Sequence, residues 1–182
     1  VDMVGAGLTD KPQAAYSLTY QAQFLKEFMD TLGLDRASLI GSSMGGGTAL
    51  QFSLLFPEKV EKLVLVNSFG LGQDIAIGLR LLALPFVGRL SRPTRKGAAL
   101  VLRHNVYDRK VIPDRWIELS YQKFGLPGTK RAILNVIATN LNLFGVRKTV
   151  SSPLVDKLSS IVQPALVIWG QQDRILPVAH AH

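Results

Sequence analysis

Gly41-Ser42-Ser43-Met44-Gly45 is the stretch of the chain that decides the fold. An apolar run, residues 37–40, precedes it, and residues 48–56 follow with the composition of a helix. A G-x-S-x-G motif between a strand and a helix indicates a sharp turn, the nucleophile elbow, which lifts a serine hydroxyl clear of the sheet. The sequence therefore predicts that Ser43 is a nucleophile and that Gly41, Ser42 and Gly45 shape the elbow around it.

Strands and helices are expected to alternate on both sides of this motif. Residues 37–40, 63–66 and 165–169 are aliphatic runs typical of strands buried in a parallel sheet, and residues 1–4 are expected to end another strand. Apolar residues recur at helical spacing between Thr19, the predicted N-cap, and Gly33, the predicted stop. This order predicts an α/β fold, a mostly parallel sheet with helices on both faces.

Strands and helices no longer alternate between the second and third aliphatic runs. Between about residues 69 and 160 the chain contains five prolines, and helical segments at residues 75–84, 116–124 and 129–143. We expect a helical cap or lid insertion over residues 70–160. Residues 1–69 would then form the core with the elbow, and residues 161–182 a core strand and an acid loop, with the core continuing beyond the chain end.

Composition narrows the class of protein. The 182 residues are 47% apolar and 19% charged, which is ordinary for a globular domain. No apolar run is long enough to span a bilayer. The absence of cysteine excludes disulfides and thiolate chemistry and fits a reducing compartment, so we expect a cytoplasmic protein.

The chain is basic, with 21 Lys and Arg against 13 Asp and Glu. Six of these cations and no carboxylate lie between Asp74 and Asp108. Such a segment could meet an acidic substrate, a membrane surface or nucleic acid, or it could be a solvated helix face. We favour the solvated face and predict no nucleic-acid binding, because no aromatic platform is interleaved with the charges.

A serine nucleophile needs a base and a carboxylate that orients the base. Asp173 follows the last predicted strand, so it should lie at the carboxyl edge of the sheet and act as the acid. The backbone N–H of Met44 is predicted to stabilise the oxyanion. His104 falls in the predicted lid, His180 lies only seven residues after Asp173, and His182 ends the chain. None of them is well placed as the base.

Two simpler interpretations stay open. The elbow glycines could merely pack a helix onto a sheet, and Asp173 could cap the helix predicted near Pro177 or pair with Arg174. Serine chemistry of this kind needs no metal and no organic cofactor.

With these residues in view, the chain resembles the α/β-hydrolase superfamily over nearly its whole length. The matching segments are Val1-Asp2-Met3-Val4-Gly5-Ala6-Gly7, the elbow from Gly41 to Gly46, Phe56-Pro57-Glu58-Lys59-Val60, and Ile168-Trp169-Gly170-Gln171-Gln172-Asp173. The resemblance implies that an N-terminal strand pair with an oxyanion loop and a C-terminal strand with the catalytic histidine lie outside these residues. The chain would then be a fragment of a longer enzyme.

Within the superfamily, the chain is most similar to the meta-cleavage product hydrolases, which cut carbon–carbon bonds. Two departures are Ser42, where members often have asparagine, and the non-basic pair Ser120-Tyr121, near which a substrate-gripping arginine would fall. The resemblance implies a hydrolase acting on a small, largely apolar carbonyl substrate: an ester, a thioester or a vinylogous diketone. An acyltransferase using the same serine and a non-catalytic ligand-binding protein are the rival functions. The oligomeric state stays open.

Overall fold

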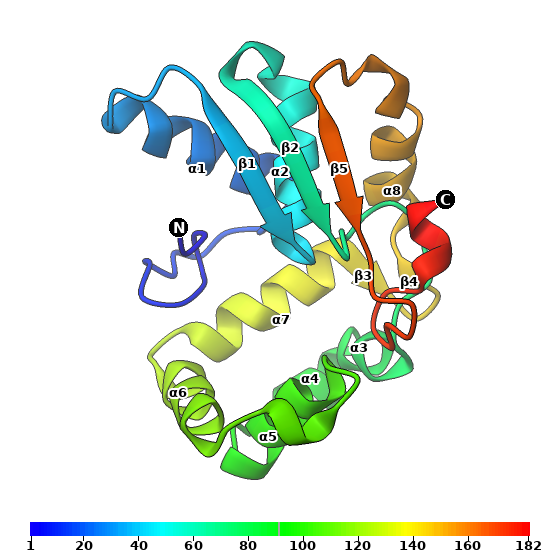
Figure 1. Ribbon diagram of the computed structural model, residues 1–182. Coiled ribbons are helices and arrows are strands. Elements are labelled where there is room, and N and C mark those ends of the chain that lie inside the picture. The colour runs from blue at the N-terminus through cyan, green and yellow to red at the C-terminus, as the bar shows by residue number, and fades with distance from the viewer. Residues whose placement is uncertain (91) are drawn as a thin grey trace.

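A parallel sheet forms the centre of the molecule. The computed structural model describes residues 1–90 and 92–182. In this part of the chain the sheet consists of β1 (Ala37–Ser42), β2 (Val60–Val66) and β5 (Ala165–Ile168), with β2 in the middle (Figure 1). Ser42 is paired with Val66, and Val66 with Ile168. All strands therefore end at the same edge, and the loops that follow them are neighbours.

Helices and one antiparallel strand pair make up the rest of the described structure. They are α1 (Leu18–Thr31), α2 (Met44–Leu55), η1 (Pro57–Lys59), α3 (Ile77–Leu82), α4 (Pro85–Leu90), α5 (Arg95–His104), η2 (Arg109–Val111), α6 (Asp114–Gly125), α7 (Thr129–Asn140), the antiparallel pair β3 (Leu141–Asn142) and β4 (Gly145–Val146), α8 (Lys148–Val155), η3 (Leu158–Ser160) and η4 (Val178–Ala181). The predicted α/β class with a parallel sheet is confirmed.

One face of the sheet is covered by helices. Ala22 and Met29 of α1 pack with Phe52 of α2 and Val60 of β2, and Leu154 of α8 joins a cluster that contains Leu50 and Leu63. On the other face, Ile40, Leu166 and Ile168 are 47% to 77% exposed. Among the described residues, the helices expected on both faces are thus found on one.

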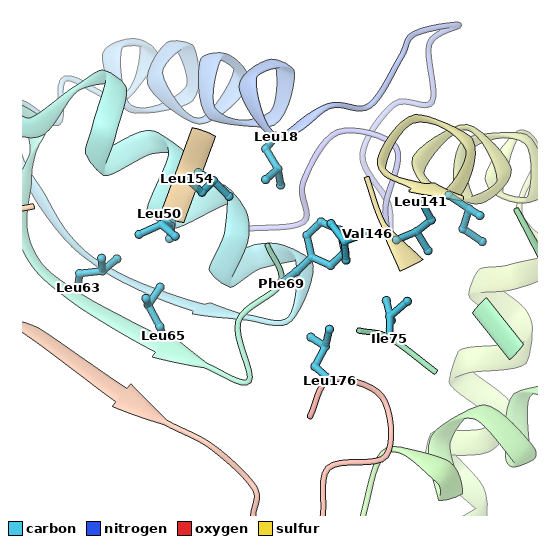
Figure 2. Packing of buried hydrophobic residues seen from close by; sticks show 12 residues of the cluster. Leu18, Leu50, Leu63, Leu65, Phe69, Ile75, Leu141, Val146, Leu154 and Leu176 are labelled. Carbon is cyan, nitrogen blue, oxygen red and sulfur yellow. The ribbon is translucent and has the colours of Figure 1, made fainter. Parts of the chain in front are cut away.

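The main core joins the sheet layer to the segment α3–α7. Figure 2 shows Leu50 and Leu65 on one side of the core, and Ile75, Leu141 and Val146 on the other, with Phe69 between them. Leu176, from the loop after β5, belongs to the same cluster. The helices α3–α7 lie beyond the carboxyl edge of the sheet (Figure 1). One continuous apolar core therefore fixes the strand ends, the loop after β5 and this helical segment together.

Several predicted boundaries are wrong, each for a local reason. α1 begins at Leu18, because the Ser17 hydroxyl rather than that of Thr19 accepts a hydrogen bond from the Tyr20 N–H. α2 begins directly after Ser43 rather than at Thr48, because close packing offsets the poor helix propensity of its glycines. Residues 1–3 have no regular secondary structure and Val4 begins a turn, so no strand ends there.

Candidate active site

Ser43 occupies a strained turn between β1 and α2. Its φ of 50° and ψ of −120° lie in a region that residues other than glycine rarely adopt. The Ser43 N–H donates to the Val66 carbonyl over 3.0 Å, and its own carbonyl accepts from the N–H groups of Gly46, Gly47 and Phe69. These four backbone hydrogen bonds hold the turn against its strain. Among the described residues, the Ser43 hydroxyl caps no N–H of α2, and the residue is exposed.

The glycines around Ser43 have different roles. A Cβ on Gly41 would lie 2.6 Å from the Gly45 carbonyl carbon and 2.7 Å from the Gly46 nitrogen. A Cβ on Gly46 would lie 2.7 Å from the Ser68 hydroxyl oxygen, and one on Gly47 equally close to the Phe69 carbonyl oxygen. At Gly45, by contrast, a Cβ would meet nothing within 4 Å. Gly41, Gly46 and Gly47 are thus required by close approach of the backbone, whereas Gly45 is not.

Asp173 lies in the loop after β5 and is held on both carboxylate oxygens. Its Oδ1 accepts hydrogen bonds from the backbone N–H groups of Ile175, at 2.7 Å, and Leu176, at 3.0 Å. Its Oδ2 accepts from the side-chain amide of Asn67. Two of these donors follow Asp173 in the chain, so the carboxylate does cap the turn before η4. The third donor, Asn67, comes from the end of β2. Its hydrogen bond turns the Asp173 carboxylate toward the loops that follow the other strands.

Asn67 is the site residue that the sequence did not reveal. It follows β2 directly and, like Ser43, has a positive φ, of 45°; within the described chain these are the only non-glycine residues with one. Its side-chain oxygen accepts from the Gly170 N–H at 3.3 Å while its amide donates to Asp173. Asn67 therefore bridges the ends of β2 and β5. An asparagine with a positive φ at a strand end could have been suspected from its tolerance of that conformation, but its partner lies 106 residues away.

The relative position of Ser43 and Asp173 follows from the strand order. Ser43 follows β1, Asn67 follows β2 and Asp173 comes from the loop after β5, so Asn67 stands between the other two. Two strand spacings separate the chains that carry Ser43 and Asp173, about 10 Å. That separation suits a single imidazole placed between a hydroxyl and a carboxylate.

The three histidines occupy other environments. The His180 ring packs edge-on against Trp169, with ring centroids 6.3 Å apart, and its Nδ1 is buried without a hydrogen-bond partner in the described part of the chain. Burial lowers the pKa of His180, and the negative charges of Asp74 and Asp173 oppose this only partly. His104 lies at the end of α5 and His182 is the last residue. In no case does the structure show a histidine bonded to Asp173.

A large cavity reaches the elbow. It has a volume of about 890 Å³ and lies between residues 1–7, the start of α2 and the helices α3, α5, α6 and α7. Met44 and Gly45 line it beside Ser43, and most of the remaining wall is apolar, including Leu102, Trp116 and Ile133. The Ser43 carbonyl accepts from the N–H groups of Gly46 and Gly47, whereas those of Met44 and Gly45, the first two of α2, have no acceptor within their own helix. The cavity therefore offers an apolar chamber with hydrogen-bond donors at its elbow end.

Comparison with known proteins agrees with this arrangement. A family model described as alpha/beta hydrolase fold matches residues 1–182. The chain belongs to the alpha/beta hydrolase fold family. A relative in this family, the 2-hydroxy-6-oxo-2,4-heptadienoate hydrolase of Pseudomonas putida, is 29% identical over 178 residues, which cover 97% of this chain and 61% of the relative.

A second relative and a solved structure extend the comparison. The dihydrolipoyllysine-residue acetyltransferase component of the acetoin cleaving system of Cupriavidus necator is 31% identical over 183 residues, 100% of this chain and 46% of the relative. A solved meta-cleavage product hydrolase from Pseudomonas fluorescens IP01 superposes with a TM-score of 0.79 at 24% identity, covering 99% of this chain and 63% of that one. The superfamily and its meta-cleavage likeness, inferred from the sequence, are confirmed. The chain spans about half the length of the relatives it matches.

Among the described residues, no three histidine or acidic side chains are grouped in a way that could hold a metal ion. None of the helices in this part of the chain has the length and apolar character that a bilayer crossing requires.

Proposed function

We propose that this chain carries the nucleophile and the acid of a serine hydrolase that cleaves an ester, a thioester or a carbon–carbon bond next to a carbonyl. The observation that carries the proposal is the strained turn at Ser43, which exposes a hydroxyl beside the start of α2 and two strand spacings from a firmly held carboxylate. Backbone strain of 1 to 3 kcal/mol, about what such a turn costs, persists where surrounding hydrogen bonds enforce it, and it is typical of active sites.

The proposed roles follow from this geometry. Ser43 attacks the carbonyl carbon, and the Met44 N–H stabilises the oxyanion at the N-terminus of α2, where the helix dipole also favours negative charge. Asp173 orients and charge-stabilises the histidine that takes the serine proton. Its Oδ2 keeps lone-pair capacity for that bond, because Asn67 donates only one hydrogen bond to it.

We propose that the histidine is supplied from outside these 182 residues. His180 is a poor candidate, since its Nδ1 is enclosed without a partner and its ring packs against Trp169 and Gly72. The chain covers only 61% of the Pseudomonas putida hydrolase, so there is room in such a protein for a further strand with the base. The 182 residues alone should then show no useful turnover, because a triad without its base loses about 10⁶-fold in rate.

The segment α3–α7 is proposed to act as a lid over the apolar cavity. Its helices supply Leu79, Leu102, Trp116, Phe124 and Ile133 to the cavity wall. These side chains would surround the apolar body of a substrate while Ser43 and Met44 act on its carbonyl. A largely apolar carbonyl compound is therefore the proposed substrate.

A fluorophosphonate probe tests the nucleophile in the whole protein. We expect one covalent adduct, mapped by peptide mass spectrometry to Ser43. Ser43→Ala should abolish it, and Ser42→Ala, the matched control at the neighbouring exposed serine, should retain it. An adduct on Ser42 or elsewhere, or an equal yield in Ser43→Ala, would refute the assignment. Ligand binding by a protein that never reacts would favour the non-catalytic alternative.

An acyltransferase is the second candidate, because one relative is named as an acetyltransferase component. The two activities share the acyl-enzyme and differ in what resolves it. Incubation of an activated ester with and without alcohol or thiol acceptors separates them, since a transferase yields the new ester or thioester in preference to the acid. Loss of absorbance from 2-hydroxy-6-oxo-2,4-heptadienoate would identify carbon–carbon cleavage.

A further inference from the structure

A basic groove lies on the outside of the segment α3–α7, apart from the proposed catalytic residues. It encloses about 580 Å³ along α5 and η2, and it is lined by Lys96, Arg103, His104, Arg109 and Lys110 around Leu100. Within the described chain, none of its four Lys and Arg side chains forms an ion pair with a carboxylate. The groove therefore gathers cationic side chains that form no ion pair with a carboxylate of the described residues.

The helix that carries the groove is firmly anchored on its opposite side. The Thr94 hydroxyl caps α5 by accepting from the Gly97 N–H at 2.9 Å. Arg95 pairs with both Asp114 and Glu118 of α6, and Ala98 is buried against Ile112 and Ile117. Lys96, Leu100 and Arg103 stand at positions i, i+4 and i+7, so the anchored helix presents them on a single outward face.

Large apolar side chains are exposed in the groove and on the elements next to it in the chain. Leu100, inside the groove, is 70% exposed, and Leu90 of α4, a few residues before α5, is 81% exposed. Phe86 of α4 and Tyr107, between α5 and η2, are each more than three-quarters exposed. Exposed apolar groups mixed with Lys and Arg are the composition of an element that lies in a membrane interface, with the cations at the headgroups and the apolar groups slightly deeper.

We propose that α4, α5 and η2 form a docking surface for an anionic lipid bilayer, with the basic groove holding lipid headgroups. The groove supplies the charge complementarity, and Leu90, Leu100 and Phe86 supply apolar contact with the acyl boundary. A nucleic acid would leave Leu90 and Leu100 in water, so it fits this surface less well. Docking here would bring the outer face of the proposed lid to the surface where apolar compounds partition.

Flotation of the purified protein with lipid vesicles tests this proposal. We expect binding to vesicles of phosphatidylcholine mixed with phosphatidylglycerol, weaker binding to pure phosphatidylcholine, and loss of the difference in high salt. Each Lys or Arg at an anionic surface changes affinity about fivefold, so Arg103→Gln with Lys110→Gln should weaken binding about 30-fold. Leu100→Gln should weaken the binding that remains in high salt.

The matched control removes the same charge elsewhere. Lys62 lies in β2 and Lys157 between α8 and η3, and both are exposed. The amino end of β2 lies at the opposite end of the sheet from α5 (Figure 1). Lys62→Gln with Lys157→Gln should leave vesicle binding within about twofold of the unmodified protein. Ser43→Ala should also bind unchanged, so the result does not depend on the proposed catalytic function.

Three outcomes would overturn the proposal. The first is equal binding to both kinds of vesicle, and the second is an equal loss of binding in the groove and control variants. The third is displacement of the protein from anionic vesicles by short duplex DNA at lower concentration than by soluble phosphate esters. The last result would assign the groove to nucleic acid instead. Circular dichroism spectra that match across the variants ensure that altered folding does not account for a loss.

Discussion

The two motif glycines on either side of Ser43 should respond in opposite ways to the same substitution. In Gly41→Ala the new Cβ would stand 2.6 Å from the Gly45 carbonyl carbon and 2.7 Å from the Gly46 nitrogen, where ordinary contact begins at 3.4 Å. The atoms it meets belong to the backbone of α2 and cannot swing away as a side chain can. The Gly45 carbonyl oxygen lies closer still, so the helix start must move by about 1.1 Å relative to β1.

The expected cost of Gly41→Ala is at the upper end of the range for overpacking, about 3 kcal/mol of unfolding free energy. Gly45→Ala places its Cβ in open space on a helical residue, and alanine is favoured over glycine in a helix by up to about 1 kcal/mol. The two variants should thus differ by about 3 to 4 kcal/mol although both remove a glycine from G-x-S-x-G.

Urea unfolding followed by circular dichroism measures this difference. With a slope of about 2 kcal/mol per molar urea, the midpoints should lie about 1.5 to 2 M apart, with Gly45→Ala at or above the unmodified protein. Equal midpoints for the two variants, or a Gly45→Ala protein as unstable as Gly41→Ala, would refute the argument that close approach of α2 to β1 fixes the motif.

Three further predictions concern the strand-end loops. Ser43→Gly should be more stable than Ser43→Ala by about 1 to 2 kcal/mol in urea unfolding, because only glycine relieves the positive φ; equal stabilities would show that the turn is unstrained. Asn67→Ala should lower the free energy of unfolding by about 1 to 3 kcal/mol and slow fluorophosphonate labelling of Ser43 in the whole protein, because Asp173 loses a hydrogen-bond donor. Unchanged labelling would show that Asn67 contributes only to stability. Burial lowers the pKa of His180, so the unfolded chain should bind a proton that the folded chain does not as the pH falls below about 6.5. The free energy of unfolding should therefore drop there, with Trp169 fluorescence as the readout. A His180→Phe variant with the same pH profile would contradict this.

The sequence allowed the strand, the elbow and the acid loop to be predicted because each is a local pattern. An aliphatic run followed by G-x-S-x-G, or by a loop with Asp173, can be recognised without knowing what lies next to it. The helix start after Ser43 was predicted too late, at Thr48, because glycine propensity argued against a helix that close packing enforces. The distinction between Gly41 and Gly45 likewise depends on which backbone faces each Cα.

Asn67 escaped prediction for a different reason. Its significance comes from bonds to Gly170 and Asp173, more than 100 residues further along the chain. Local periodicity carries no information on such pairings, and the strand order that creates them is a property of the whole sheet. The same holds for the groove on α5, where the charges were visible in the sequence but the exposure of Leu100 among them was not.

The chain of bonds from Ser43 through Val66 and Asn67 to Asp173 has a consequence for protein engineering. Ser43 N–H bonds to the Val66 carbonyl, Asn67 N–H bonds to the Ile168 carbonyl, and the Asn67 side chain reaches Asp173. If the serine turn and the acid loop were grafted onto a new scaffold without the end of β2, Ser43 and Asp173 would lose the segment that fixes their relative position. The smallest transplantable unit of this site is therefore three adjacent strand termini.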